Sequence, residues 1–279
     1  MNAFLTQETR QRLARNRALQ CGLFLLAALL LMAYAGPYLI SHDPLAVDFD
    51  QALLAPSLTH PFGTDDLGRD VLSRVIHAAA TDLQIALVCV LLPFAIGTTI
   101  GLISGYIGGW VDAVLMRLVD ILWAFPFYVL VIAIVGSMGP SIGNMYLAFT
   151  VVIWISFARI VRGEVLLVKN AEYIQAAKVL GYSQLRIVLR HVLPNVITPA
   201  IVFMMADVVL TILAVTSLGF LGLGIQPPTP EWGVMISEGR NFILDGWWIS
   251  LFPGLAIVYV GITFALLGDG LDDFLRPKA

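Results

Sequence analysis

Long runs without a charged residue constrain this chain more than any other feature of its sequence. Residues 19–40, 83–103 and 248–267 contain no Asp, Glu, Lys or Arg and are mostly apolar. A helix of about 20 apolar residues spans the ~30 Å hydrocarbon core of a bilayer, and it satisfies its own backbone hydrogen bonds there. Each of these runs therefore predicts a transmembrane helix.

The composition agrees with a membrane protein and excludes several other classes. Hydrophobic residues make up 59% of the 279 residues and charged residues only 13%, against about 25% charged in soluble domains. This excludes a cytosolic enzyme, and it also excludes a disordered chain, which would have low hydrophobicity. The net charge of −3 gives no sign of nucleic-acid binding. Cys21 and Cys89 lie inside apolar runs and form neither a disulfide framework nor a metal-type spacing.

Three further runs carry few charges and bring the number of predicted spans to six. The predicted spans are residues 19–40, 83–103, 113–135, 145–161, 196–218 and 248–267. The first is longer than the apolar core of a signal peptide, about 7–15 residues, and no small-x-small site follows it, so we expect it to be retained. The predicted fold class is an all-α membrane protein with six transmembrane helices.

The distribution of Lys and Arg predicts the orientation. Four arginines precede the first span, which places the N-terminus in the cytoplasm, and six spans return the C-terminus to the same side. On this topology every Lys and Arg is cytoplasmic except Arg69, Arg74 and Arg240. Residues 1–18 are compatible with either an interfacial helix or a disordered segment.

We divide the chain at residue 82. Residues 1–82 hold a cytoplasmic N-terminal segment, the first span and an outer loop, whose end has apolar residues at helical spacing: Val71, Leu72, Val75, Ile76 and Ala79. We expect a helix there, lying on the membrane surface or on the bundle. Residues 83–279 form a five-helix core that contains a cytoplasmic loop at residues 162–195.

The cytoplasmic loop has the pattern of two short helices with a break. Asn170 is a plausible N-cap, and Gly181 suits the positive φ of a helix stop. Ser183 would cap the second helix, which we expect to end at or before Leu193, because a residue preceding proline (here Pro194) disfavours helical backbone.

The first of these helices has the features of a docking element. Ala176 and Ala177 are small enough for another backbone to approach closely, and Glu172, Gln175 and Lys178 give a polar face. A solvated connector is the alternative reading. A cytoplasmic insert with this much regular structure favours a contact with a soluble partner over a solvated connector.

The spacing A-A-x-x-x-G-x9-H-x-L-P, from Ala176 to Pro194, resembles the EAA loop of bacterial ABC importer permeases. In that family the coupling helix docks into a cleft of the ATP-binding subunit. The family pattern begins with Glu where this chain has Gln175, which removes one charge. The resemblance assigns ATPase coupling to Glu172, Gln175, Ala176, Ala177, Lys178, Gly181, Leu193 and Pro194.

Three further stretches are similar to one branch of these permeases, the second permease of the dipeptide, oligopeptide and nickel importers. They are HPFGTDDLGRD at residues 60–70, FLGLG at 220–224 with PEWG at 230–233, and LGD at 267–269. The resemblance implies contacts with an external binding protein near Asp65, Asp66, Glu231 and Trp232.

The resemblance also implies the rest of the transporter. It implies a MetI-like type I permease fold in a bacterial inner membrane, a homologous second permease, two ATP-binding subunits and a periplasmic or extracellular solute-binding protein. The sequence has no G-x-x-x-x-G-K-[ST] phosphate-binding motif. We therefore expect no enzymatic activity and no cofactor in this chain, with ATP and Mg²⁺ bound by the partners. ATP-driven closure of the partners would move the loop and the spans attached to it, giving alternating access.

Glycines and buried charges give three further expectations. Gly97, Gly101 and Gly105 recur every four residues, which favours close helix packing. Asp207 lies in the middle of a span, where it contacts either a substrate amine or metal ion in the translocation pathway, or a neighbouring helix. Arg117 and Asp120, three residues apart, are expected to form an ion pair.

No set of residues predicts catalysis or a metal site. The four histidines are far apart in sequence, and one lies on the other side of the membrane. The function predicted is import of short peptides. Import of nickel or a glutathione-like solute by the same machinery stays open, as do, less favoured, a secondary transporter and a channel.

Overall fold

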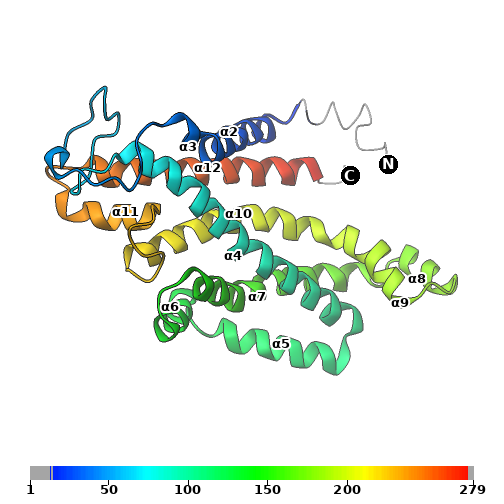
Figure 1. Cartoon of the computed structure of the whole chain (residues 1–279). Coiled ribbons are helices and arrows are strands. Elements are labelled where there is room, and N and C mark those ends of the chain that lie inside the picture. Colours follow the sequence, from blue (N-terminus) through cyan, green and yellow to red (C-terminus); the bar gives the residue numbers. More distant parts are fainter. Residues whose placement is uncertain (1–12, 14, 276–279) are drawn as a thin grey trace.

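The computed structural model describes residues 13 and 15–275, and every regular element in that part of the chain is a helix (Figure 1). The helices are α2 (Arg17–Tyr34), α3 (Gly36–Leu39), α4 (Val71–Ile107), α5 (Gly109–Trp123), α6 (Phe127–Met138), α7 (Ile142–Val168), α8 (Glu172–Val179), α9 (Gln184–Ile187), α10 (Leu193–Phe220), α11 (Trp232–Gly239) and α12 (Trp248–Leu275), with short 3₁₀ segments at Phe49–Gln51 and Arg240–Phe242 and a π segment at Val188–Val192.

Among the described residues, four helical stretches are long and apolar enough to cross a membrane. They are α2, α4, the stretch 184–220 that includes α10, and α12. They overlap the predicted spans at 19–40, 83–103, 196–218 and 248–267 and confirm these as apolar helices. The run 145–161 lies within α7. The count of six spans and the cytoplasmic position of both termini stay predictions.

The span predicted at residues 113–135 is not one straight helix, because two helices occupy that run. α5 and α6 are apolar enough together to make one span, but their axes are bent by 85°. Pro126 is the N-cap of α6. It lacks a backbone N–H and disfavours helical backbone in the residue before it, so the helix breaks here. The pair is either a broken span or a re-entrant loop.

α4 is one continuous helix of 37 residues. The helix predicted at residues 71–79, on the membrane surface or on the bundle, is confirmed as a helix, but it is not separate from the next span: this stretch forms the first turns of α4, which passes unbroken through residues 82 and 83. Asp70 caps its N-terminus by accepting a hydrogen bond from the Ser73 N–H at 2.7 Å. No Gly or Pro interrupts residues 71–92, and the apolar face of the first turns is buried against the bundle.

α4 and α7 pack closely along their length. A Cβ atom added at Gly97 would lie 2.2 Å from the backbone oxygen of Trp154, and one added at Gly101 would lie 2.6 Å from that of Ala158. At Gly105 the nearest atom would be 2.8 Å away. The three glycines thus lie on the face where the two helix backbones approach one another.

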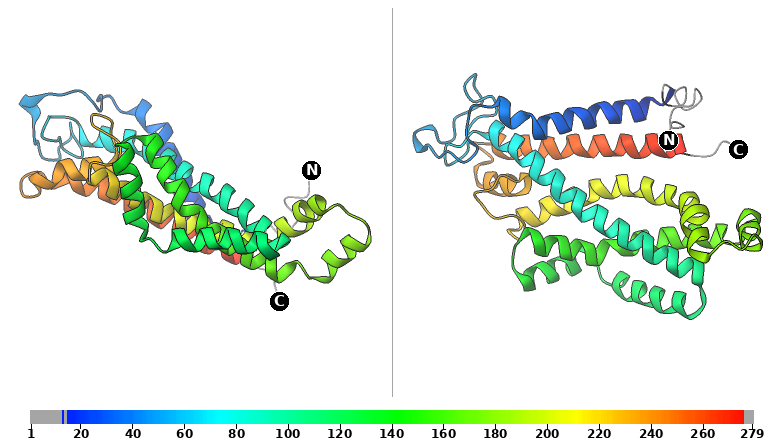
Figure 2. Two further views of the ribbon diagram at one scale, coloured as in Figure 1. Left: turned by 90° about the horizontal axis from the view of Figure 1, so that it is seen from below. Right: turned by 45° about the vertical axis from the view of Figure 1, so that its right-hand side comes forward.

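α10 runs through the middle of the bundle and contacts α4, α7, α11 and α12, whereas α2 lies on the outside against α12 and α4. The views agree that α8 and α9 project from one end of the bundle, the end at which α2 begins and α12 finishes (Figures 1 and 2). The loops around residues 41–70 and α11 lie at the opposite end.

Candidate functional site

The projecting helix α8 ends in a defined stop. Gly181 has φ of +78°, its N–H donates to the Lys178 carbonyl at 3.0 Å, and the Tyr182 N–H donates to the Ala177 carbonyl at 3.2 Å. These two bonds form a Schellman motif, which satisfies carbonyls at the helix end. At the other end the expected cap at Asn170 is wrong, because the N-cap is Ala171 and no side chain caps the helix.

α8 turns one face inward and leaves the rest exposed. Ile174 and Ala177 are buried, which corrects the expectation that Ala177 lies on the docking surface with Ala176. Glu172, Gln175, Ala176 and Lys178 are exposed. Large apolar side chains are exposed around them, namely Tyr173, Val179, Leu180, Leu185 and Leu189. Several large apolar side chains exposed together on one projecting segment favour an interaction site.

The second helix of the loop does not stop before Pro194 as predicted. Residues 184–220 form one helical stretch, in which Ser183 caps the start through the Arg186 N–H at 3.4 Å. Leu193 keeps helical backbone (φ −51°, ψ −48°), and its N–H bonds to the Val188 carbonyl in the π segment. The widened turn accommodates the missing N–H of Pro194 without ending the helix. The loop is therefore joined to α10 by continuous helix.

Charged side chains tie α5 to α7 beside the loop. Arg162 binds Asp112 with two hydrogen bonds of 2.6 Å. Arg159 pairs with Asp120 at 2.5 Å and lies over the Trp123 ring at 4.5 Å. The predicted Arg117–Asp120 pair is wrong, because the carboxylate pairs with an arginine from α7 instead.

Asp207 lies inside the bundle and borders a cavity of about 300 Å³. The residue is 7% exposed, and its Oδ2 has no hydrogen-bond partner among the described residues. Thr211, one helical turn further, has an unpartnered Oγ1 on the same cavity. Sequence reasoning missed Thr211, although its i+4 spacing from Asp207 places both on one helix face.

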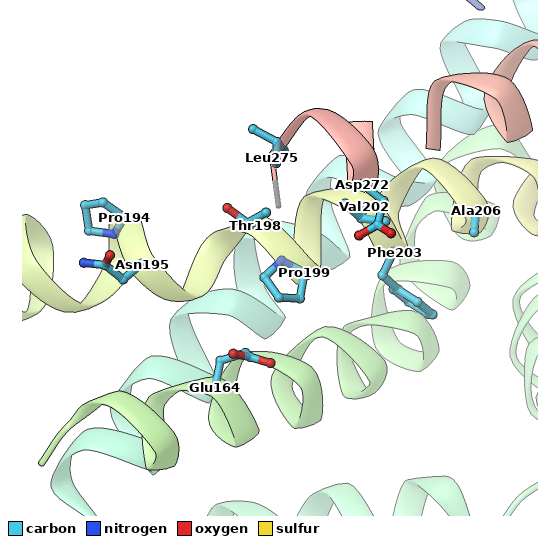
Figure 3. A pocket seen from close by; sticks show the side chains of 10 residues that line it. All are labelled: Glu164, Pro194, Asn195, Thr198, Pro199, Val202, Phe203, Ala206, Asp272 and Leu275. Carbon is cyan, nitrogen blue, oxygen red and sulfur yellow. The ribbon is translucent and has the colours of Figure 1, made fainter. Parts of the chain in front are cut away.

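A second cavity of about 810 Å³ opens along α10 toward the end that carries α8. Glu164 of α7 and Pro199 and Phe203 of α10 line it, and Asp272 of α12 lies on its other side (Figure 3). Pro194, assigned to coupling from the sequence, also lines this cavity, whereas Phe203 borders both cavities. The two cavities thus follow one another along α10.

At the opposite end, three residues predicted to contact a binding protein are inside the chain. Asp65, Glu231 and Trp232 are each at most 1% exposed. The Trp232 backbone N–H donates to Asp82 Oδ2 at 3.1 Å, and its indole N–H donates to the Val75 carbonyl at 3.1 Å. The two bonds of Trp232 hold α11 against α4. The burial of all three residues contradicts their expected place on the surface. Asp66 is half-buried.

Glu231 and Asp65 each anchor a local structure. Glu231 caps α11 by accepting hydrogen bonds from the Gly233 and Val234 N–H groups at 2.8 and 2.7 Å, and burial raises the pKa of its carboxyl. Asp65 accepts a 2.6 Å bond from Arg69 Nε. Arg69 and Arg74 both reach Glu238 of α11, at 3.0 and 2.9 Å.

Two histidines that are distant in sequence meet at this end. A ligand atom from each of His42, His60 and Asp70 lies within 4.8 Å of the others. However, His60 Nδ1 is 2.8 Å from Asp70 Oδ2 and its Nε2 is 2.8 Å from Gln51 Oε1. Both ring nitrogens lie within hydrogen-bond distance of a protein oxygen, so His60 bridges Gln51 to the N-cap of α4.

A bundle of long apolar helices with cavities along its central helix and an exposed helix at one end is typical of a transport permease. Residues 97–279 match the family described as the binding-protein-dependent transport system inner membrane component, and residues 5–56 match the N-terminal TM domain of oligopeptide transport permease C. The chain belongs to this family of inner-membrane transport components.

Relatives and solved structures agree with this assignment. The chain is 42% identical over 274 residues to the dipeptide transport system permease protein DppC of Bacillus subtilis, covering 98% of this chain and 86% of the relative. It is 40% identical over 270 residues to the glutathione transport system permease protein GsiD of Pectobacterium atrosepticum, covering 96% and 89%.

The fold is similar to a chain of the MetNI methionine ABC transporter in an inward-facing conformation. The TM-score is 0.59 at 16% identity, over 73% of this chain and 97% of the other. The predicted MetI-like type I permease fold and the inner-membrane location are confirmed.

Proposed function

We propose that this chain is one of two permease subunits of an ATP-driven importer of short peptides and forms half of its translocation pathway. The observation that carries the proposal is the exposed helix α8, which is followed, after its stop at Gly181, by one helical stretch that runs from residue 184 through α10 past the cavities. The dipeptide transport function printed for a relative at 42% identity supports peptides as the substrate class.

The exposed surface of the loop is the docking site for an ATP-binding subunit. Glu172, Gln175, Ala176 and Lys178 surround a protruding helix end with exposed apolar side chains. Apolar area that is covered on docking supplies the attraction, and the polar rim sets the register. ATP and Mg²⁺ are bound in the partner subunits, and this chain contributes no cofactor of its own.

Movement of the docked subunits reaches the pathway along two routes. One is the helical stretch from Gln184 through Leu193 and Pro194 into α10. The other is α7, whose end is held to α4 by the bond from Lys169 Nζ to the Gly105 carbonyl at 3.0 Å. Close packing at Gly97, Gly101 and Gly105 makes α4 and α7 move as one unit. The pathway then alternates between openings on the two sides of the membrane.

The homologous second permease completes the pathway beside α10, where Asp207 faces one cavity. The external solute-binding protein delivers substrate at the end opposite α8. Asp66 and the exposed apolar side chains of the outer loops, such as Phe49 and Leu58, are available for that contact.

Substitution of Gly181 tests the coupling. Gly181→Val should reduce ATP-driven dipeptide uptake in reconstituted vesicles at least about tenfold, because a β-branched residue cannot adopt the positive φ that ends α8. Gly181→Asn, which tolerates this backbone, is the matched control and should keep most of the uptake. The amount of assembled complex is measured in parallel. Normal uptake by the Val variant would contradict this account of the loop.

A glutathione-like solute or nickel is the alternative cargo for the same machinery. The glutathione transport function printed for a relative at 40% identity favours the first of these. A shared fold and coupling loop do not distinguish the cargoes, whereas uptake measurements with each labelled solute do.

A further inference from the structure

The cavity beside Asp207 is formed by three helices and has a mixed lining. Phe127 and Tyr128 come from α6, Ser156 from α7, and Phe203 and Asp207 from α10. Its volume of about 300 Å³ is at the lower end of the range for small-molecule sites, roughly 300–1,000 Å³. It is therefore large enough to hold a small polar group with its neighbouring atoms.

Two polar atoms in this cavity lack partners. Asp207 Oδ2 and Thr211 Oγ1 are both buried and accept or donate no hydrogen bond among the described residues. The residues are 7% and 1% exposed. Buried polar groups in proteins are almost always hydrogen-bonded, because an unpaired one has lost its bonds to water without replacement. A carboxylate and a hydroxyl that face the same cavity thus point to a ligand that satisfies both.

The charge of the site defines the ligand. No Lys, Arg or His among the described residues is ion-paired with Asp207, so its carboxylate has no positive partner within the chain as described. An ammonium group carries three N–H donors and matches two oxygen acceptors. The rings of Phe127, Tyr128 and Phe203 surround it with apolar and π surface, which favours a cation with an organic substituent. The absence of His and Cys from the lining makes the site poor for nickel.

Phe203 separates this cavity from the one that opens toward α8. Its ring packs edge to face on Phe157 of α7, with centroids 5.3 Å apart. Figure 3 shows Phe203 projecting from α10 at the inner end of the second cavity, with Glu164 on the neighbouring helix. A group bound at Asp207 is thus one side chain away from the second cavity.

We propose that Asp207 and Thr211 form a binding subsite for the ammonium group of the transported solute, behind a barrier made by Phe203. The inference rests on the proposed function, since it assigns a place in the pathway to the free amino group of a short peptide. It adds that the permease itself, and not only the external binding protein, selects for an amine.

Thiol protection in the assembled complex tests the subsite without the binding protein and without transport. A cysteine is introduced at the cavity by Ser156→Cys in a background in which Cys21 and Cys89 are replaced by serine and alanine. The rate of maleimide labelling is measured in the purified complex with increasing concentrations of Ala-Ala, of N-acetyl-Ala-Ala and of nickel. Thr229→Cys, exposed in the loop between α10 and α11, is the control position.

We expect Ala-Ala to slow labelling at Ser156→Cys and not at Thr229→Cys, and the acetylated peptide and nickel to have no effect. Asp207→Asn should raise the half-protecting concentration about tenfold or more, because it removes a charge-assisted hydrogen bond, and Thr211→Val should raise it severalfold. Both substitutions nearly conserve side-chain volume.

Equal protection by the acetylated peptide, protection by nickel, absence of protection, or unchanged protection in Asp207→Asn would each overturn the subsite. Uptake of labelled Ala-Ala by cells that carry the unsubstituted chain is measured alongside. Failure of that uptake would contradict the proposed function, whereas normal uptake without amine-specific protection would contradict only the subsite.

Discussion

At the scale of single residues, the outer end of the bundle is held by buried charges rather than by apolar contacts alone. Arg74 is 1% exposed and lies between Glu238 at 2.9 Å and Asp65 at 3.4 Å. A buried cation of this kind requires its partners, because removal of one leaves an uncompensated charge. Asp65, Glu231 and Trp232, which the sequence suggested for a protein contact, are instead buried parts of this internal framework.

The carboxyl of Glu231 predicts a pH dependence of stability. Burial raises the pKa of Glu231 above its ordinary value of 4.5. The folded chain keeps a proton there at pH values at which the unfolded chain has lost it, so this group makes the free energy of unfolding fall as pH rises from 4.5 toward the raised pKa. We expect Glu231→Gln to remove this decline.

The measurement is the thermal unfolding midpoint of the purified complex in detergent at a series of pH values upward from 4.5. The difference between variant and wild type reports the titration of Glu231 together with its effect on the neighbouring Asp82 carboxyl, and Glu172→Gln on the exposed face of α8 is the control. A difference that is constant with pH, or a variant that loses stability relative to wild type as pH rises, would refute the assignment.

At the scale of elements, the contact between α4 and α7 depends on the absence of side chains. Gly97→Ala would place a Cβ 2.2 Å from the Trp154 oxygen, and such overpacking costs typically about 1–3 kcal/mol. We expect a lower midpoint of thermal unfolding and less complex in the membrane. Gly163→Ala on α7, where nothing lies within 4 Å, should be neutral or slightly stabilising. Equal stability of the two variants would show that the helices do not pack at Gly97.

The elements also show how far sequence reasoning extends. The uncharged runs predicted α2, α4 and α12 because apolar content decides whether a helix enters a membrane. The effect of prolines depended on their surroundings. Pro126 breaks the third predicted span, whereas the helix continues through Pro194 because a π segment precedes it. Whether a neighbouring turn can widen is decided by tertiary packing, which the local sequence does not encode.

At the scale of the whole molecule, the site was partly predictable. Asp207 was found because a carboxylate within an apolar run is rare, and α8 was found because its glycine stop has a distinct pattern. The pairing of Asp120 with Arg159 and the burial of Trp232 depend on segments 39 and 150 residues away in the sequence. Such pairings follow from the fold and not from local spacing.

The helices α8 and α9 lie at one end of the bundle, α10 runs along it, and the outer loops and α11 lie at the other end (Figures 1 and 2). This arrangement suits a chain that transmits movement from one end to the other. On the proposed function, the energy for transport comes from partners that dock at α8. The central claim is that this transmitted movement imports short peptides.

Uptake of a labelled dipeptide by cells that lack only this chain tests the central claim most directly. Labelled nickel and labelled glutathione are measured in the same cells, and the unsubstituted chain is restored as the control. We predict that dipeptide uptake is lost, that nickel and glutathione uptake are unchanged, and that the restored chain recovers dipeptide uptake. Undiminished dipeptide uptake, with loss of either other solute, would contradict the account.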